Sequence, residues 1–185
     1  SNMLALFGNN TELTIYAQYT EVGNFVVIYS AVGADEETIP TDNTQYNIAE
    51  TSIIKIPNQE PKKLGYTFEG WKTGTDDTVY KYGTQNDTYT VPNDISGAIT
   101  FIAQWSINEY KITYELNGGI NAENAPVSYT IETDTITLPV PTKDGYNFEG
   151  WYTDAAFENA VAAIAKGSVG DMVLYAKWSE KDMAV

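Results

Sequence analysis

Cysteine and histidine are both absent from this sequence of 185 residues. Without them the chain cannot form a Ser-His-Asp or Cys-His nucleophile system. It also cannot bind zinc through sulfur or imidazole, or carry out thiol redox chemistry. The fold must be stable without disulfide bonds. These absences remove the commonest routes to catalysis, and we expect a protein that is not an enzyme.

Positive charge is scarce, with 10 basic against 25 acidic residues and a net charge of −15. A nucleic-acid backbone or an anionic membrane would be repelled by such a surface. An apolar run of roughly 18 residues, the length that spans a bilayer, is also missing. We therefore expect no nucleic-acid partner and no direct membrane insertion of this fragment, and we assign the charge to solubility.

The chain begins Ser1-Asn2-Met3, which resembles a remnant of cloning ahead of a chosen boundary. We therefore expect the sequence to be a fragment of a longer protein. A missing targeting signal then says nothing about where that protein is located.

Aromatic residues make up 13% of the chain and apolar residues 43%. This apolar content is sufficient for a hydrophobic core. Aromatic side chains pack well on the half-buried face of a sheet, so the composition favours strands.

An internal repeat organises the chain. Residues 64–71 recur as residues 144–151, with differences only at the first and fourth positions, and both copies contain Gly-Tyr-x-Phe-Glu-Gly-Trp. A second shared segment follows each copy, at residues 99–105 and 172–178. A third version of this segment, at residues 13–19, has no Gly-Tyr-x-Phe-Glu-Gly-Trp partner upstream.

We therefore predict four parts. These are a closing-strand remnant of a preceding repeat at 1–21, a divergent repeat at 22–106, a second repeat at 107–179, and a tail at 180–185. The junctions at 20–22 and 106–108 are short and contain no run of Gly or Pro. Such linkers predict restrained orientations between the repeats.

Each repeat is expected to consist mainly of strands. In the closing segments, the alternation of Ile99, Phe101, Ala103 and Trp105 has the period of a half-buried strand, and Met172, Leu174, Ala176 and Trp178 repeat it. Opening strands are predicted at 25–29 and 110–114, each followed by a glycine turn at 32–34 or 117–119. Middle strands at 53–56 and 135–138 end at Pro57 and Pro139, which cannot donate to a ladder.

The Gly-Tyr-x-Phe-Glu-Gly-Trp segment predicts an irregular strand. In a regular strand Tyr66 and Phe68 would lie on the face opposite to Trp71, although all three are large enough to favour burial. A bulge at Gly70, and likewise at Gly150, would place the rings on one face.

The two repeats diverge after the tryptophan. Residues 79–83 and 89–92 are strand-like, whereas residues 157–166 have helical spacing in a window so short that a strand or loop is nearly as well supported. We expect at most one or two short helices in the chain.

The second repeat carries the motifs of a known family. Residues 110–119 read Tyr-x-Ile-Thr-Tyr-x-x-Asn-Gly-Gly, residues 139–154 read Pro-x-Pro-Thr-Lys-x-Gly-Tyr-x-Phe-x-Gly-Trp-Tyr-Thr-Asp, and residues 174–178 read Leu-Tyr-Ala-Lys-Trp. These blocks, in this order, resemble the Listeria–Bacteroides repeat, or internalin B-type B repeat, of bacterial surface proteins. The first repeat is a looser copy that lacks Asn-Gly-Gly.

The resemblance implies a mostly β fold of small β-grasp-like, ubiquitin-like modules in tandem. It also implies an extracellular location at a bacterial cell wall or surface, and a stalk, spacer or adhesion role with an unknown protein or glycan partner. The family has no catalytic residues to carry over to this chain. The alternative is a glycan-binding accessory module of an extracellular enzyme.

Three groups of residues are candidate sites. Neighbouring acids at Asp35, Glu36 and Glu37, or at Asp76 and Asp77, could support glycosidase chemistry, but acids in such loops are more typical of solvated surface. Residues 75–78 and 86–88 offer oxygen ligands without the spacing of a calcium loop.

Tyr80, Tyr82 and Tyr89 could stack on a glycan, or could belong to the core. The sequence therefore predicts no catalytic, cofactor or metal residue, and leaves the ligand-binding residues unknown. A binding function, if present, is expected between Gly74 and Gly97.

Overall fold

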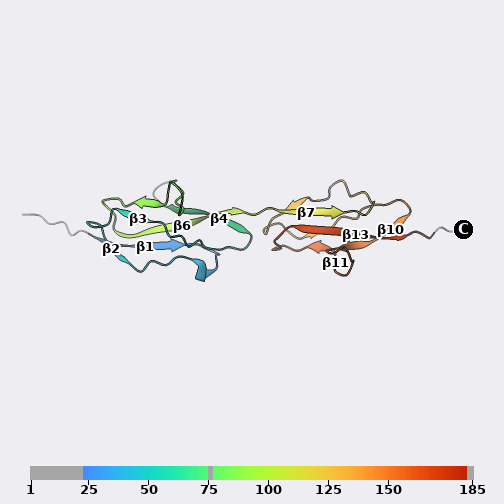
Figure 1. Ribbon diagram of the computed structural model, residues 1–185, viewed down its shortest axis with the longest axis horizontal. Helices are drawn as coiled ribbons and strands as arrows, with labels where there is room; N and C mark the ends of the chain where they lie inside the picture. The colour runs from blue at the N-terminus through green and yellow to red at the C-terminus, as the bar shows by residue number, and fades with distance from the viewer. Residues whose placement is uncertain (1–22, 75–76, 183–185) are drawn as a thin grey trace, which may run out of the picture.

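A computed structural model describes residues 23–74 and 77–182. The described chain is built from strands, with one 3-10 helix, η2 at Glu36–Thr38, as the sole helical element of that part. Figure 1 shows two bodies placed end to end, with strands running along the long axis of the molecule. The prediction of a mostly β protein is confirmed, and the described residues agree with the expectation of at most one or two short helices.

The body that contains β1 to β6, here called the first module, is organised around one mixed sheet. The strands of this sheet stand in the order β2-β1-β6-β4. Their bounds are Asn24–Ser30 for β1, Gln45–Asn47 for β2, Tyr66–Thr73 for β4 and Gly97–Ile107 for β6. The first and last strands, β1 and β6, run parallel at the centre, and β2 and β4 flank them antiparallel. A separate pair is formed by β3 at Ile53–Lys55 and β5 at Thr88–Thr90.

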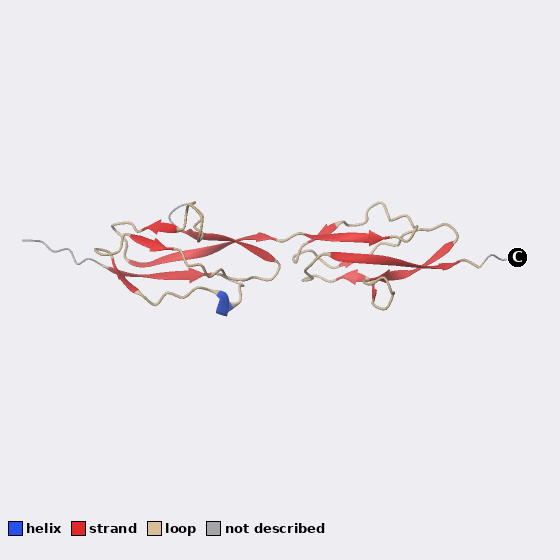
Figure 2. Ribbon diagram, viewed as in Figure 1, coloured by secondary structure: helices blue, strands red, loops and turns tan. Residues whose placement is uncertain are grey.

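The second module repeats this arrangement. Its sheet has the order β11-β10-β13-β7-β8, with β7 and β13 parallel. The bounds are Tyr110–Glu115 for β7, Ser128–Tyr129 for β8, Tyr146–Tyr152 for β10, Ala160–Val161 for β11 and Met172–Glu180 for β13. A two-stranded ribbon joins β9 at Ile136–Thr137 to β12 at Ala163–Ile164. Figure 2 shows the two modules as similar sets of strands along one axis.

Each module has its own core. Trp71 and Phe101 are fully buried in the first, and Leu174 and Ala176 in the second. The closing strands alternate as predicted, because their inward residues are buried or half-buried along β6 and β13.

The predicted bulges are confirmed. The register of β4 on β6 shifts between Phe68 and Gly70, and that of β10 on β13 shifts between Phe148 and Gly150. The glycines adopt φ of 139° and 132°, a region that side chains rarely enter. Phe68 then meets Trp71 edge-on with ring centroids 5.0 Å apart, so both rings lie on the core side.

The predicted turns are also confirmed. Gly33 has a φ of 79°, and Asn117 and Gly118 have φ of 49° and 85°. The middle strands form at Ile53–Lys55 and Ile136–Thr137, ahead of the prolines that were expected to end them.

The sequence leaves helix, strand and loop open for residues 157–166, and the structure shows that they do not form a helix. This stretch forms the short strands β11 and β12, and Phe157 has a φ of 58° that no helix accepts. The Asp154 carboxylate accepts the backbone N–H groups of Glu158 at 3.1 Å and Asn159 at 2.8 Å. These bonds stabilise a turn where a helix would need to begin.

The strand expected at residues 79–83 reduces to a single bridge between Tyr80 and Trp71. The closing strand expected at residues 13–19 lies outside the described residues. Among the described residues, no helix has the length and hydrophobicity needed to cross a membrane.

Candidate interaction surface at the joint between the modules

The connection between the modules is two residues long. Strand β6 ends at Ile107 and β7 begins at Tyr110. The Asn108 N–H donates to the Gly65 carbonyl at 2.9 Å, and the Thr67 hydroxyl donates to the Asn108 side-chain oxygen at 2.6 Å. The linker is therefore bonded to the start of β4 and is held against the first module.

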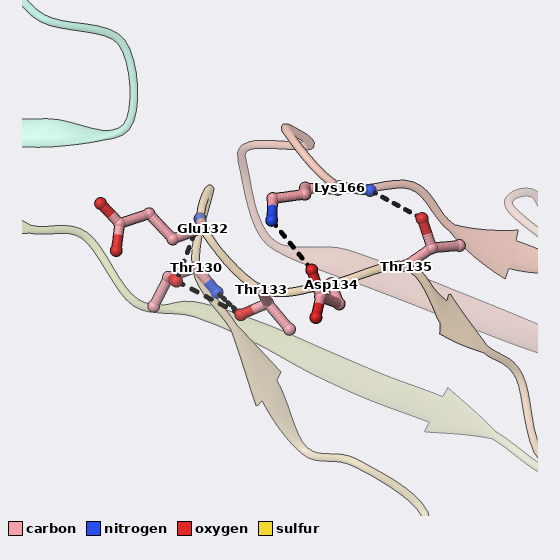
Figure 3. Close-up of polar contacts among 6 residues, drawn as sticks. All are labelled: Thr130, Glu132, Thr133, Asp134, Thr135 and Lys166. Atoms are coloured by element: carbon pink, nitrogen blue, oxygen red, sulfur yellow. Dashed lines mark hydrogen bonds and ion pairs between the residues drawn. The ribbon is translucent and has the colours of Figure 1, made fainter.

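A turn of the second module, at residues 130–135, lies against Gly65, the residue to which the linker is bonded. Figure 3 shows its polar contacts, in which Thr133 and Thr130 bond each other and the Thr130 hydroxyl accepts the Glu132 N–H at 3.3 Å. A further bond runs from the Gly167 N–H to the Ile131 carbonyl at 3.1 Å. The turn is thus fixed by its own side chains and by the loop that follows β12.

An ion pair supports the same turn. The Lys166 ammonium lies 2.9 Å from the Asp134 carboxylate, and the Lys166 N–H donates to the Thr135 hydroxyl at 3.2 Å (Figure 3). The hydrogen bond from Lys166 lowers the pKa of Asp134. Both charges are exposed, so this pair orients the loop more than it stabilises the fold.

Two residues of this turn, Ile131 and Glu132, contact the first module. A Cβ placed on Gly65 would lie 2.7 Å from the Cβ of Ile131, so only glycine leaves room for the isoleucine. The Tyr66 hydroxyl donates to the Glu132 carboxylate, and this bond raises the pKa of Tyr66. We call these residues, Gly65, Tyr66, Asn108, Ile131 and Glu132, the joint.

Each module also carries a lysine stacked on aromatic rings. The Lys63 ammonium lies 4.0 Å from the centroid of the Tyr66 ring and 5.9 Å from that of Trp105. In the second module, Lys143 lies 4.1 Å from Tyr146 and 5.8 Å from Trp178. Contacts of this kind stabilise by about 0.5–1 kcal/mol at exposed sites. The lysine therefore lies at similar distances from the corresponding tyrosine and tryptophan in each module.

The sequence indicated none of these residues as a site. A signal was present, since Lys precedes Tyr by three positions in both copies, as Lys63 to Tyr66 and Lys143 to Tyr146. The partners Ile131 and Glu132 had no such signal, because they lie far along the chain from Gly65 and Tyr66.

The tyrosines proposed for glycan stacking do not form a surface platform. Tyr80 and Tyr89 are 8% and 4% exposed and pack edge-on against each other and Phe101. Only Tyr82 is exposed, with Lys55 above its ring. For Tyr80 and Tyr89, the core interpretation is therefore the right one.

The acidic candidates are dispersed. Asp35, Glu36 and Glu37 are exposed at the 3-10 helix, and Asp77 pairs loosely with Lys72 at 3.4 Å. Asp76 lies outside the described residues. Within residues 23–74 and 77–182, no group of three or more acidic side chains is placed to hold a metal ion.

The 86–88 segment is engaged in backbone pairing. The carbonyl groups of Asn86 and Asp87 accept hydrogen bonds from Lys81 and Ile56. Thr88 begins β5.

Comparison with known proteins assigns both modules to one family. The model of the Listeria-Bacteroides repeat domain matches residues 25–104 and again residues 110–177. A putative Gly-rich membrane protein of Evansella cellulosilytica is 32% identical over 93% of this chain, and a putative membrane protein of the same organism is 29% identical over 94%. Internalin H of Listeria monocytogenes is 33% identical over 75% of the chain.

The chain spans 19% to 24% of the length of these relatives. No solved structure matches it. The first matched segment covers most of the four-stranded sheet and the second most of the five-stranded sheet, each with its bulge and its parallel central pair. The chain therefore belongs to the Listeria-Bacteroides repeat domain family and carries two copies of its repeat.

Proposed function

We propose that this chain is a non-catalytic segment of a bacterial cell-surface or secreted protein, where it acts as a spacer or adhesion segment. Family membership supports a surface-protein repeat region, and two relatives are named as membrane proteins. The repeat boundaries stay as proposed, 22–106 and 107–179. The location at the cell wall or surface, and the partner protein or glycan there, belong to the same proposal.

The contacts at the joint are the observation that supports the spacer role. A spacer must keep successive modules in line, and a two-residue linker limits the angles they can adopt. The contact of Ile131 with Gly65 and the bond from Tyr66 to Glu132 restrict them further. An adhesion segment benefits from the same property, because it presents a surface at a set distance from its anchor.

The β-grasp assignment of each module belongs to this proposal. It is favoured by the central parallel pairing of the first and last strands within a mixed sheet. A helix across the sheet, which that fold usually has, is missing from the described residues.

The spacer role is tested by comparing the two modules in solution. We expect residual dipolar couplings from both modules to fit a single alignment tensor in the native chain. Inserting Gly-Ser-Gly-Ser after Asn108 should give two independent tensors, while the chemical shifts within each module stay unchanged. Independent tensors in the native chain would overturn the proposal.

A glycan-binding role is the second candidate. A shallow depression on the second module is lined by the aromatic residues Tyr146, Phe157, Tyr175 and Trp178, together with Lys143 and Lys177. Aromatic faces are common platforms for ligands. The Trp178 ring is also used internally, since its Nε1 donates to the Leu116 carbonyl at 2.9 Å. Titration of neutral oligosaccharides followed by NMR would show shifts at these residues if the role is correct, and none if it is not.

A further inference from the structure

We propose that the far end of the second module, at Gly145 and Tyr146, is a docking site for the turn of another repeat of this family in the same chain. This inference rests on the proposed spacer role. The occupant is a module joined after Asp182 that presents a β-branched apolar residue followed by an acid, as Ile131 and Glu132 do.

The far end of the second module has the same backbone as the occupied end of the first. Tyr146 pairs with Glu180 in the register in which Tyr66 pairs with Ile107. The Lys181 N–H donates to the Gly145 carbonyl at 2.9 Å, as the Asn108 N–H does to the Gly65 carbonyl at 2.9 Å. The backbone that receives a module in one copy is therefore present in the other.

The lysine and tyrosine side chains beside the two glycines are also arranged alike. Lys143 stacks on Tyr146 at 4.1 Å, as Lys63 does on Tyr66 at 4.0 Å. The backbone conformations of Gly65 and Gly145 match, with φ of 78° and 79°.

The two positions differ in whether a turn of another module covers them. Gly65 is buried beneath Ile131, whereas Gly145 is exposed and a Cβ added there would meet nothing within 4 Å. The Tyr66 hydroxyl is bonded to Glu132, whereas the Tyr146 hydroxyl has no hydrogen-bond partner among the described residues. A shallow depression surrounds this position, lined by Gly145, Tyr146, Glu180, Lys181 and Asp182.

The turn and its isoleucine occur in both modules, whereas the acid does not, because Ala49 stands at the position of Glu132. In the first module the corresponding turn begins at Asn47, whose side-chain oxygen accepts the Ala49 N–H at 2.8 Å and whose carbonyl accepts the Glu50 N–H at 3.0 Å. In the second module Thr130 has the same role for Glu132 and Thr133. Both turns place an isoleucine directly after the capping residue, Ile48 or Ile131.

Each module thus has a turn at one end and a receiving surface at the other. Because the two ends of a module differ, modules can associate head to tail. A row of modules joined in this way can be extended and need not close into a ring. Contacts limited to neighbouring modules are typical of repeat proteins. Glu180 and Asp182 lie beside Lys181 at the free surface, so the Tyr146 hydroxyl, and not net charge, is the specific donor for the incoming acid.

The test adds a third module. The chain through Asp182 is followed by a second copy of residues 110–182, which reproduces the two-residue spacing between β6 and β7. Isoleucine methyl labelling then reports the nuclear Overhauser contacts of each Ile131. We expect the original Ile131 to contact Gly65 and the appended Ile131 to contact Gly145.

Gly145→Ala provides the matched variant. Its methyl group would overlap the appended Ile131, so the second contact should be lost in the three-module protein. In the present chain the same substitution adds only backbone strain, because the space beside Gly145 is open. The drop in melting temperature should therefore be larger with the third module present.

The outcomes separate the two proposals. A contact at Gly65 without one at Gly145 would overturn this inference and leave the spacer role intact. Absence of both contacts would overturn the spacer role itself. Concentration-dependent shifts at Gly145 in the present chain would assign the surface to a second molecule, which would also overturn the inference.

Discussion

Two glycines with the same conformation experience different surroundings at the ends of the two modules. Gly65 and Gly145 each precede the tyrosine that opens a strand, but only Gly65 has a neighbour where a side chain would be. The left-handed conformation costs a residue with a Cβ roughly 1–2 kcal/mol. Because both positions share this cost, comparing them isolates the contact across the joint.

Gly65→Ala should destabilise the first module and separate it from the second. Backbone strain accounts for about 1–2 kcal/mol, and overlap with Ile131 adds to it or displaces the turn. Urea denaturation and the Ile131 methyl shifts would measure the two effects. Gly145→Ala is the control, with strain alone expected. Equal losses of stability and unchanged Ile131 shifts in both variants would contradict this prediction.

The Tyr66 hydroxyl gives the joint a pH dependence. Its hydrogen bond to Glu132 raises the pKa of Tyr66 above its ordinary value of about 10. A raised pKa in the folded state means that the bond contributes below pH 10 and is lost as pH rises through the raised pKa. NMR titration of ring-labelled tyrosine should show that Glu132→Gln moves the pKa of Tyr66 back toward its ordinary value. Glu158→Gln, which removes an equal charge from an exposed loop, should leave it unchanged, and an unaffected Tyr66 in Glu132→Gln would refute the bond.

At the scale of elements, the strands with the clearest alternation were the most predictable. The closing strands β6 and β13 follow their period of two, and the bulges follow from three aromatic rings that must share one face. Residues 157–166 were not predictable in the same way. Their helical spacing covers a short window, and the Asp154 cap favours a turn by a mechanism that periodicity does not detect.

The bulge glycines are expected to differ in their tolerance of a methyl group. At Gly70 a Cβ would lie 2.5 Å from the Val79 side chain and 2.8 Å from the Tyr80 carbonyl, whereas at Gly150 the nearest atom is 3.9 Å away. Strain at such φ values costs of the order of 1–3 kcal/mol at either site. Overpacking adds about 1–3 kcal/mol at Gly70 alone. Thermal melts of Gly70→Ala and Gly150→Ala should therefore show the larger loss for Gly70, and the opposite order would refute the packing argument.

At the scale of the whole molecule, the repeat was visible in the sequence but the joint was not. Tandem modules follow from the recurrence of Gly-Tyr-x-Phe-Glu-Gly-Trp. The short linker predicted a restrained orientation, but the residues that restrain it come from a turn 66 positions along the chain from Tyr66. A contact between elements so distant in sequence leaves no local pattern.

Two separate cores predict that the modules lose stability separately. Leu174→Ala should destabilise the second module by about 2–5 kcal/mol, because it removes a fully buried side chain from that core alone. Phe101→Ala is the counterpart in the first module, with about 3–5 kcal/mol expected. Hydrogen exchange at single residues would locate each effect. Loss of protection across both modules in either variant would contradict independent cores.

The parallel pairing of the first and last strands of each module has a mechanical consequence. The chain enters a module at the start of β1 or β7 and leaves from the end of β6 or β13, and each pair lies side by side in the same direction. Tension applied to the two ends would therefore pull the paired strands in opposite directions along their length. The load falls in shear on the whole ladder at once, from Phe25↔Gly97 to Ser30↔Ile102 in the first module, instead of opening one hydrogen bond at a time.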